Sequence, residues 1–477
     1  MKIVLFALNG SWAHSALSVR CLKTALADAG FAAEILEGNL RDRTRGLLAR
    51  LVEKEADVYG FSCYIWNIEQ MLALAADLKA LLPHCRVVLG GPEVSFATER
   101  FEGLPFVDHV ITGEGEEAIV KVANALQNGE ALPRVIEGER DEKFRSRGIH
   151  YEKTAPVTSL VYYESSRGCP FSCSFCLSSA TQGVRAKDAA QTLSELLEFE
   201  QIAGDLTIKL VDRTFNFDRE RAKEIWRGLL SEAYTKCYHF EIAAHLLDEE
   251  SFQILSRFPK GKVRLEIGLQ SSNEKTLAAV SRHTNAEAVL AAAKRLTAMN
   301  TCHVHLDLIA GLPHEDMESF ARSFDAAHGA CHVLQLGFLK FLHGTAIRRD
   351  AASFGAVFEQ KPPYTVLKTD ALSFDDLCKL HRISDLMERL RDSDRFCHSL
   401  DLIFAHLPSP FAFYKELDAY LEGALGREVQ KISQRDLFWH LSQFTKGVLP
   451  RELHAALSER LRADYSAAEV RRAPKGL

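Results

Sequence analysis

The chain has 477 residues and a net charge of -6, and apolar residues make up 47% and charged residues 26% of it. These values are typical of soluble globular protein with two to four domains, and they exclude a strongly basic nucleic-acid binder. No apolar run reaches membrane-spanning length, and the apolar start Met1–Phe6 is too short for a signal peptide. We therefore expect a cytoplasmic protein whose 11 cysteines are thiols or metal ligands, with neither a membrane span nor nucleic acid as a partner.

The first 130 residues alternate short β-branched runs with stretches of helical periodicity. Such alternation predicts an α/β fold with a parallel, doubly wound sheet, that is, a Rossmann-like domain over residues 1–130. Expected helices include Ala16–Asp28 and Ile68–Leu82. The expected strands are Lys2–Ala7, Ala32–Glu37, Asp57–Ser62, Arg86–Leu89 and His109–Ile111.

The carboxyl ends of these strands share an unusual composition, because two are rich in glycine and two carry tryptophan. Ligands of doubly wound sheets bind beyond such ends, and glycine lets backbone approach a ligand closely. Each end alone is typical of an ordinary tight turn, but the four together indicate a platform for a large flat ligand. The residues concerned are Asn9, Gly10, Ser11, Ser62, Cys63, Tyr64, Gly90, Gly91, Gly113, Glu114 and Gly115.

Residues 131–155 are irregular and rich in charge, and we expect a linker there. A second alternating array over residues 156–345 has six β/α units, fewer than the eight of a full barrel. It predicts a central partial (β/α)6 TIM barrel whose catalytic face lies at the carboxyl ends of the strands. The expected strands are Thr158–Tyr163, Leu206–Val211, Phe240–Ala244, Val263–Gly268, His305–Ile309 and Val333–Leu339.

From residue 346 the β/α rhythm gives way to helical spacing, which predicts a helical carboxy-terminal domain over residues 346–477. Its short basic end, residues 471–475, is typical of a solvated terminus. The expected helices are Leu377–Leu390, Phe411–Leu421, Gln434–Leu441 and Arg451–Leu461.

Three cysteines directly after the first expected barrel strand form the most informative motif. Cys169, Cys173 and Cys176 have C-x3-C-x2-C spacing, with no fourth cysteine or histidine close by in sequence. A closed structural metal site needs four protein ligands, so three thiolates on one loop indicate an iron–sulfur cluster with one open iron. Zinc completed by a distant ligand is the main alternative, and a redox pair is poorly served by this spacing. Arg167, two residues before Cys169, is expected to favour the thiolate form of the loop cysteines.

The run Glu164-Ser-Ser-Arg-Gly-Cys169-Pro-Phe-Ser-Cys173-Ser-Phe-Cys176 resembles the cluster loop of the radical S-adenosylmethionine (SAM) superfamily. The doubly wound domain before it narrows the resemblance to the cobalamin-binding class. The resemblance implies that the three cysteines hold a [4Fe-4S] cluster, that SAM chelates its fourth iron, and that the amino-terminal domain binds cobalamin. It also implies a reducing electron donor such as flavodoxin or ferredoxin, and cleavage of SAM to methionine and a 5'-deoxyadenosyl radical.

Three motifs at later strand ends extend the resemblance into the barrel. They are Asp212-Arg-Thr-Phe-Asn216 at the end of the second strand, Glu266-Ile-Gly-Leu-Gln-Ser271 at the end of the fourth and Asp307-Leu-Ile-Ala-Gly-Leu-Pro313 at the end of the fifth. The resemblance implies polar contact of Gln270 and Ser271 with SAM, and packing of Gly311 and Leu312 near adenine. It assigns the ribose hydroxyls to Glu266, although a shift of one residue in register would turn this side chain to the other face.

Three further residues follow barrel strands on the expected catalytic face. His245 and Lys340 are candidates for substrate binding or proton transfer, although a lone histidine is more often a structural hydrogen-bonding group. Asp212 stands where much of the superfamily has a Gly-Gly-Glu motif, which assigns it to the SAM or substrate side. The amino-terminal domain departs from the common Asp-x-His-x-x-Gly cobalt-ligand motif, since Trp12 replaces its aspartate. We therefore expect cobalamin bound without a protein histidine, and His14 as a ligand is the minor alternative.

These features predict a cobalamin-dependent radical SAM enzyme, a methyltransferase that acts on an unactivated carbon of an unidentified substrate. The resemblance implies that the deoxyadenosyl radical takes a substrate hydrogen, that the carbon radical takes methyl from methylcobalamin, and that a second SAM restores the methyl group. A cobalamin-dependent cyclase or rearrangement enzyme is the first alternative. An RNA-modifying enzyme resembling methylthiotransferases is another, although these have further cluster cysteines in the first domain. A zinc protein without catalysis is the alternative from a different class.

Overall fold

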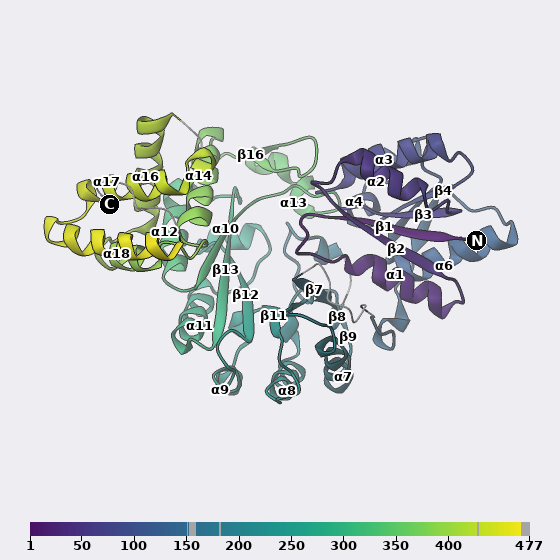
Figure 1. Cartoon of the computed structure of the whole chain (residues 1–477), viewed down its shortest axis with the longest axis horizontal. Coiled ribbons are helices and arrows are strands. Elements are labelled where there is room, and N and C mark those ends of the chain that lie inside the picture. The colour runs from purple at the N-terminus through teal and green to yellow at the C-terminus, as the bar shows by residue number, and fades with distance from the viewer. Residues whose placement is uncertain (150, 152–158, 181–182, 427–428, 469–477) are drawn as a thin grey trace. The chain divides into compact units, whose positions relative to one another are not determined.

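The computed structural model describes residues 1–149, 151, 159–180, 183–426 and 429–468 (Figure 1). The described chain forms two compact units. Unit 1 comprises Met1–Leu265, Lys340–Arg349 and Glu359–Thr365, and unit 2 comprises Glu266–Leu339, Asp350–Phe358 and the residues from Val366 onward. The basic end at residues 471–475 and part of the predicted linker (150 and 152–155) lie outside the described residues.

The amino-terminal sheet of unit 1 has the order β2-β1-β3-β4-β5-β6, and its paired strands are parallel. Its last strand corrects the linker prediction, because β6 lies inside residues 131–155 and pairs with β5 from Val110–Val135 to Gly113–Gly138. The strands are β1 Ile3–Asn9, β2 Ala33–Asn39, β3 Val58–Ser62, β4 Arg86–Gly90, β5 His109–Gly113 and β6 Val135–Gly138.

Helices cover both faces of this sheet, as expected for a doubly wound domain (Figure 1). Val4, Phe6 and Leu8 of β1 pack in one core with α2 (Thr44–Val52) and α3 (Ile68–Leu81). The alternate residues Ile3 and Leu5 pack on the opposite face with α1 (Leu17–Asp28) and α6 (Gly115–Asn128). Successive strand side chains point to opposite faces, so a strand with apolar residues at both alternations is buried on both sides. The short helices α4 (Pro92–Ser95) and α5 (Glu99–Glu102) follow β4.

The second sheet contains all six strands that the sequence predicted for the partial barrel. Its order is β14-β13-β12-β11-β10-β7, and the sheet ends at β7 and β14, so it is an incomplete barrel among the described residues. The boundary between the two units falls within β12. The strands are β7 Leu160–Tyr163, β10 Thr207–Leu210, β11 Cys237–Ile242, β12 Val263–Gln270, β13 Cys302–Ala310 and β14 Val333–Phe338.

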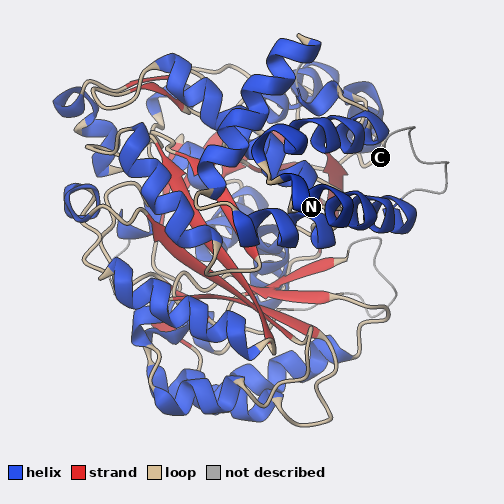
Figure 2. Ribbon diagram, turned by 90° about the vertical axis from the view of Figure 1, so that its left-hand side faces the viewer, coloured by secondary structure: helices blue, strands red, loops and turns tan. Residues whose placement is uncertain are grey.

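Helices alternate with these strands along the chain, and Figure 2 shows the strands, in red, among them. Several of the helices begin with an Asp or Asn whose side chain accepts a backbone N–H of the first turn, for example Asp188, Asp218 and Asp316. The helices are α7 Ala189–Glu200, α8 Arg219–Leu229, α9 Glu249–Leu255, α10 Glu274–Ala279, α11 Ala286–Met299 and α12 Met317–His328.

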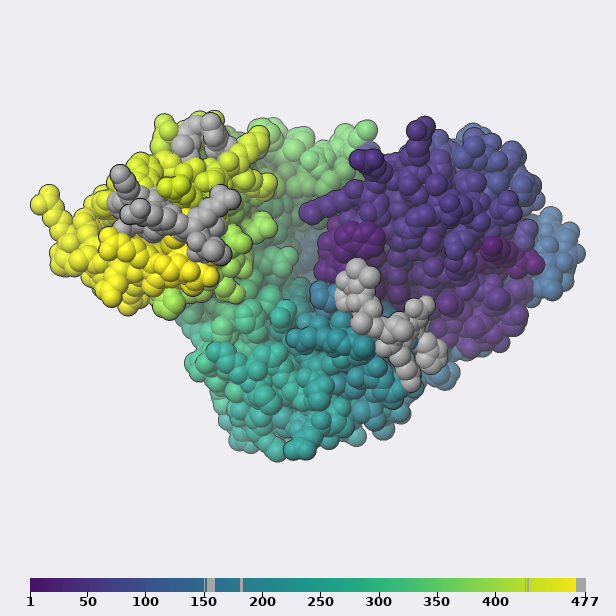
Figure 3. All heavy atoms as spheres, in the orientation of Figure 1, coloured from purple at the N-terminus to yellow at the C-terminus, as the bar shows by residue number. Residues whose placement is uncertain are grey.

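Unit 2 ends in a helical region, as predicted. Before it lie α13 (Ala346–Arg349, in unit 1) and a ribbon of β15 (Val357–Phe358) and β16 (Val366–Lys368). Figure 3 shows the atoms of its last helices, in yellow, at the surface. Within the described part of the chain, no helix is both long and apolar enough to cross a membrane. The helices are α14 Phe374–Leu390, α15 Cys397–His406, α16 Pro410–Leu425, α17 Gln434–Val448 and α18 His454–Ala468.

Candidate two-cofactor site

The cysteine loop follows β7 in unit 1. Cys173 is buried with 7% of its surface exposed, whereas Cys169 and Cys176 are partly exposed. The backbone N–H of Cys176 donates to the carbonyl of Cys173 over 3.1 Å, which folds the last two cysteines into one turn. Cys169 Sγ lies 3.5 Å from the hydroxyl of Thr214, which follows β10. The loop therefore presents thiols that remain partly accessible to a bound group.

A buried carboxylate fixes the start of this loop. Asp212 has no exposed surface, and it accepts hydrogen bonds from the hydroxyls of Ser165 and Ser166 and from the backbone N–H of Ser165. Burial raises the pKa of Asp212, and the bonds from Ser165 and Ser166 counteract this. The structure thus corrects the assignment of Asp212 to SAM or substrate, because its oxygens are engaged by the chain that leads to Cys169.

A glycine at the next position of the loop lets two backbone segments approach closely. Gly168 has φ +91°, and a Cβ built on it would lie 2.1 Å from the carbonyl oxygen of Gly183. Only glycine fits this backbone without displacement of its neighbours. The residues just before it, Ser166 and Arg167 (β8), pair antiparallel with Arg185 and Ala186 (β9).

The two other polar residues predicted for the catalytic face, His245 and Lys340, occupy different settings in unit 1. His245 follows β11, and its ring lies 5.8 Å, centroid to centroid, from Phe171 of the cysteine loop. Lys340 is exposed, and its backbone forms an antiparallel bridge with Thr365. The structure therefore places His245 beside the cysteine loop, and its assignment as a proton-transfer group stays a proposal.

Exposed aromatic side chains gather at the strand ends of the amino-terminal sheet. Trp12 follows β1 and Trp66 follows β3, and each is 52% exposed, while Phe96, directly after α4, is 41% exposed. Tyr64 stacks on Trp66 with 4.3 Å between ring centroids. Aromatic faces of this kind can stack on a large flat group, and the binding of a corrin at this edge stays a proposal.

The second glycine of Gly90-Gly91 allows a close backbone approach at this edge. Gly91 has φ +117°, and a Cβ there would lie 2.5 Å from the carbonyl oxygen of Cys63. We predict that Gly91→Ala destabilises the protein by about 1–3 kcal/mol, the usual cost of such strain, and weakens cobalamin binding. Denaturant unfolding and absorbance titration with hydroxocobalamin measure the two effects. Gly103→Ala is the control, because nothing lies within 4 Å of its Cβ position; equal effects of the two substitutions would contradict the prediction.

Several side chains predicted to bind a cofactor instead bond within the domain. Asn9 donates to Glu37 over 3.0 Å, and the hydroxyl of Ser62 bonds with that of Ser18 over 2.8 Å. Cys63 is fully buried, and burial raises the pKa of its thiol to about 12. At these positions the side chains are engaged within the domain, and the cofactor contacts predicted for them stay proposals. Contact of the strand-end glycines and of Ser11 with the cofactor stays a proposal.

His14 contacts the first barrel strand. Its Nδ1 lies 2.6 Å from the hydroxyl of Tyr162, and burial, followed by the charge of Lys209, lowers the pKa of the imidazole. The backbone N–H of Leu160 also donates to the carbonyl of Ala13 over 2.9 Å. The loop after β1 therefore binds β7 directly, within unit 1.

In unit 2, Gln270 ends β12 with the left-handed φ of +70°, and its buried Oε1 has no hydrogen-bond partner among the described residues. A buried amide oxygen without a partner is costly, and it suits a group that binds a ligand. The next residue, Ser271, has no exposed surface and donates to Glu315 over 2.6 Å, so its hydroxyl is engaged internally. Gly311 has φ +89° and Leu312 is fully buried.

Glu315 is a residue that the sequence reasoning missed. It has no exposed surface, it accepts hydrogen bonds from Ser271 and Ser323 over 2.6 and 3.0 Å, and its Oε2 has no partner among the described residues. Burial raises the pKa of this carboxyl to about 7. The residue links the strand end at Gln270–Ser271 to the loop after Gly311. A lone glutamate after Pro313 has no spacing signature that would have revealed this role.

The raised pKa of Glu315 makes unfolding pH-dependent. Between pH 4.5, the ordinary value, and about pH 7, the native carboxyl keeps a proton that the unfolded chain has released. Stability therefore falls as pH rises through this window, by up to about 3 kcal/mol, and stays lower above it. We predict that Glu315→Gln removes this loss, measured by denaturant unfolding at several pH values. Glu318→Gln, on the exposed face of α12, is the control; equal pH profiles of wild type and Glu315→Gln would refute the prediction.

Three family models match the chain in order. They are the B12 binding domain over residues 7–123, the radical SAM superfamily over residues 163–327, and the family described as "Protein of unknown function (DUF4080)" over residues 352–476. The chain belongs to the cobalamin-binding radical SAM family. The cofactors of this enzyme family are cobalamin, SAM and a [4Fe-4S] cluster, and the B12-binding domain and radical SAM core correspond to the two sheets described above.

Solved structures of cobalamin-dependent radical SAM enzymes share this fold. OxsB, with aqua-cobalamin and SAM bound, superposes with a TM-score of 0.66 and 14% identity over 98% of this chain and 83% of its own. TsrM from Kitasatospora setae, with cobalamin and a [4Fe-4S] cluster bound, superposes with a TM-score of 0.63 and 15% identity over 98% of this chain and 99% of its own. At these identities the likeness establishes the fold.

Curated relatives match over shorter stretches. The cobalamin-dependent radical SAM methyltransferase TokK of Streptomyces tokunonensis is 26% identical over 60% of this chain and 47% of its own length. The hopanoid C-3 methylase of Methylococcus capsulatus is 26% identical over 42% of each chain. The anaerobic magnesium-protoporphyrin IX monomethyl ester cyclase of Cereibacter sphaeroides is 21% identical over 67% of this chain and 57% of its own. The chain spans about half the length of these relatives.

Proposed function

We propose that this chain is a cobalamin-dependent radical SAM methyltransferase that methylates an unactivated carbon. The observation that carries the proposal is the contact, within unit 1, between the cysteine loop and the strand-end loops of the B12-binding domain. Arg167, two residues before Cys169, donates to Glu114 over 2.9 Å and also to Glu116. Both carboxylates lie where β5 leads into α6, at the strand end that is proposed to bind cobalamin.

Residues of unit 1 have roles in this proposal. Cys169, Cys173 and Cys176 hold the cluster, and the aromatic and glycine-rich strand ends of the B12-binding domain hold cobalamin. The bound cofactors supply radical formation and methyl transfer, while the protein orients them and keeps water from the reacting centre. TokK and the hopanoid methylase, which match the chain, are named as a methyltransferase and a methylase.

The products test the proposal. Incubation of the reconstituted protein with SAM, a reductant and a cell extract depleted of the enzyme should yield 5'-deoxyadenosine and S-adenosylhomocysteine together. One product should gain a methyl group, which labelled methyl-SAM identifies by mass. 5'-Deoxyadenosine without S-adenosylhomocysteine, and without labelled product, would reject methyl transfer.

A radical cyclase is the second candidate, and the same assay separates it. The cyclase of Cereibacter sphaeroides matches 67% of this chain, a larger share than the methyltransferases cover. Such a reaction would release 5'-deoxyadenosine and no S-adenosylhomocysteine. The methylthiotransferase alternative is less well supported, because Cys21, Cys63 and Cys85 of the first domain are buried and burial raises the pKa of each thiol.

A further inference from the structure

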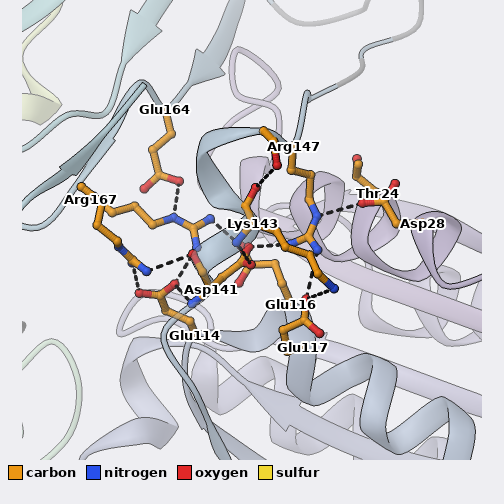
Figure 4. Close-up of polar contacts among 12 residues, drawn as sticks. Thr24, Asp28, Glu114, Glu116, Glu117, Asp141, Lys143, Arg147, Glu164 and Arg167 are labelled. Atoms are coloured by element: carbon orange, nitrogen blue, oxygen red, sulfur yellow. Dashed lines mark hydrogen bonds and ion pairs between the residues drawn. The ribbon is translucent and has the colours of Figure 1, made fainter. Parts of the chain in front are cut away.

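A network of buried charges joins the B12-binding domain to the cysteine loop inside unit 1 (Figure 4). At its centre, the guanidinium of Arg167 donates to three carboxylates. Its side chain is 14% exposed and lies over the ring of Phe144, 4.6 Å from the centroid. The acceptors are Glu164 at 2.9 Å, Glu114 at 2.9 Å and Glu116.

The structure shows a role for Arg167 that the sequence did not predict. Its guanidinium binds three carboxylates, two of which come from the B12-binding domain. Burial alone would lower the pKa of Arg167, but the charges of Glu164 and Glu116 outweigh it and raise the pKa above the ordinary value. Arg167 therefore stays charged, and its planar guanidinium fixes both the direction and the length of its hydrogen bonds to the carboxylates.

The acceptors on the cobalamin side are held rigidly. Glu114 and Glu116 stand at the start of α6, where carboxylates interact favourably with the helix dipole. Arg185 and the backbone N–H of Asp141 also donate to Glu114, the latter over 2.9 Å. Ala118, Ile119 and Val122 of the same helix pack into the core of the B12-binding sheet. The segment 113–116 is thus tied to that sheet by hydrogen bonds and by the packing of α6.

The backbone at Arg167 is held by its neighbours. Asp212 binds Ser165 and Ser166 just before it, and Ser166–Arg167 pairs with the strand Arg185–Ala186. Only Gly168 separates Arg167 from Cys169. This gives a continuous path of fixed groups from the B12-binding sheet to a cluster ligand.

We propose that Arg167 is a positioning residue that sets the separation between the cluster loop and the cobalamin loop at residues 113–116. The inference rests on the proposed binding of both cofactors. A shared substrate must reach both cofactors, and displacement of reacting groups by about 1 Å is enough to cost a large factor in rate. The arginine therefore acts through the backbone of the cysteine loop.

A second arginine of the same network is a matched control. Arg147 is also buried, with 7% of its side chain exposed, and also donates to three carboxylates. Its acceptors are Asp28, Glu117 and Asp141, all within the first 141 residues. Removal of either arginine should lower stability, but only Arg167 is bonded to the cobalamin loop and adjacent to the cysteine loop.

The experiment measures the distance between the two cofactors without substrate. Full-length wild type, Arg167→Gln and Arg147→Gln are reconstituted with iron, sulfide and hydroxocobalamin and reduced with dithionite, so that cluster and cob(II)alamin are both paramagnetic. Their dipolar coupling, read by pulsed electron paramagnetic resonance, should give one narrow distance in wild type and in Arg147→Gln. In Arg167→Gln the distance should shift or broaden by more than roughly 1 Å, the scale at which misplacement affects catalysis.

The results separate failure of this inference from failure of the proposed function. An unchanged distance in Arg167→Gln with both cofactors bound, or an equal change in Arg147→Gln, would overturn the inference. If Arg167→Gln does not retain both cofactors, Glu116→Gln is measured instead. A distance in Glu116→Gln equal to that of the wild type would overturn the inference. Failure of the wild type to bind cobalamin and a cluster would reject the proposed function itself, so the two failures are distinguishable.

Discussion

Cys173→Ala should reduce the iron content of the reconstituted protein from about four per chain, the content of a [4Fe-4S] cluster, to a trace. Cys173 is the most buried of the three loop cysteines, and its sulfur has no substitute ligand within the C-x3-C-x2-C run. SAM cleavage, measured as 5'-deoxyadenosine, should fall more than about 100-fold, since loss of an outer-shell partner alone costs up to that factor.

Cys397→Ala is the control for this substitution. Cys397 is exposed on α15 and lies far from the loop in sequence, so iron content and SAM cleavage should match the wild type. A Cys173→Ala protein that keeps a full cluster, or a Cys397→Ala protein that loses it, would place the metal elsewhere.

Asp212→Ala should destabilise unit 1 by about 3–5 kcal/mol, the range for removal of one partner from a buried charged network. It would leave Ser165 and Ser166 without their shared acceptor and would remove a negative charge close to the buried Arg221, which donates to the Ser165 hydroxyl over 2.7 Å. Denaturant unfolding, followed by a probe within unit 1, measures the change. Because Asp212 also holds the start of the cysteine loop, the variant should retain less iron.

Asp218→Ala is a nearby control for the Asp212 variant. Asp218 is exposed and caps α8 by accepting the backbone N–H of Arg221 over 3.1 Å, an interaction worth about 1 kcal/mol. Its loss should leave the cluster intact. If Asp212→Ala cost no more than Asp218→Ala, the buried carboxylate would not organise the loop.

The parts of the fold with strong local signals were predictable from sequence. β-Branched runs marked the strands of both sheets, and cysteine spacing marked the loop after β7. β6 escaped detection because it has four residues and leads directly into charged sequence, so only its pairing with β5 makes it a strand. Helix α15 was missed as well, because its apolar residues follow no clear helical period.

The roles of charged residues were harder to predict because their partners are distant in sequence. Asp212 was located correctly at a strand end, but Ser165 and Ser166, which determine its role, lie 47 and 46 positions earlier. Arg167 bonds to Glu114 and Glu116, 53 and 51 positions away in another domain. No spacing rule connects such pairs, so only the fold reveals them.

Metal and cofactor stoichiometry after anaerobic reconstitution tests the central claim most directly. The full-length protein, incubated with iron, sulfide and hydroxocobalamin and then separated from unbound reagents, should contain about four irons and four sulfides per chain, as expected of one [4Fe-4S] cluster. It should also retain cobalamin in a one-to-one ratio, seen by its absorbance. Stoichiometric zinc with no iron, or a protein that retains no cobalamin, would contradict the two-cofactor account.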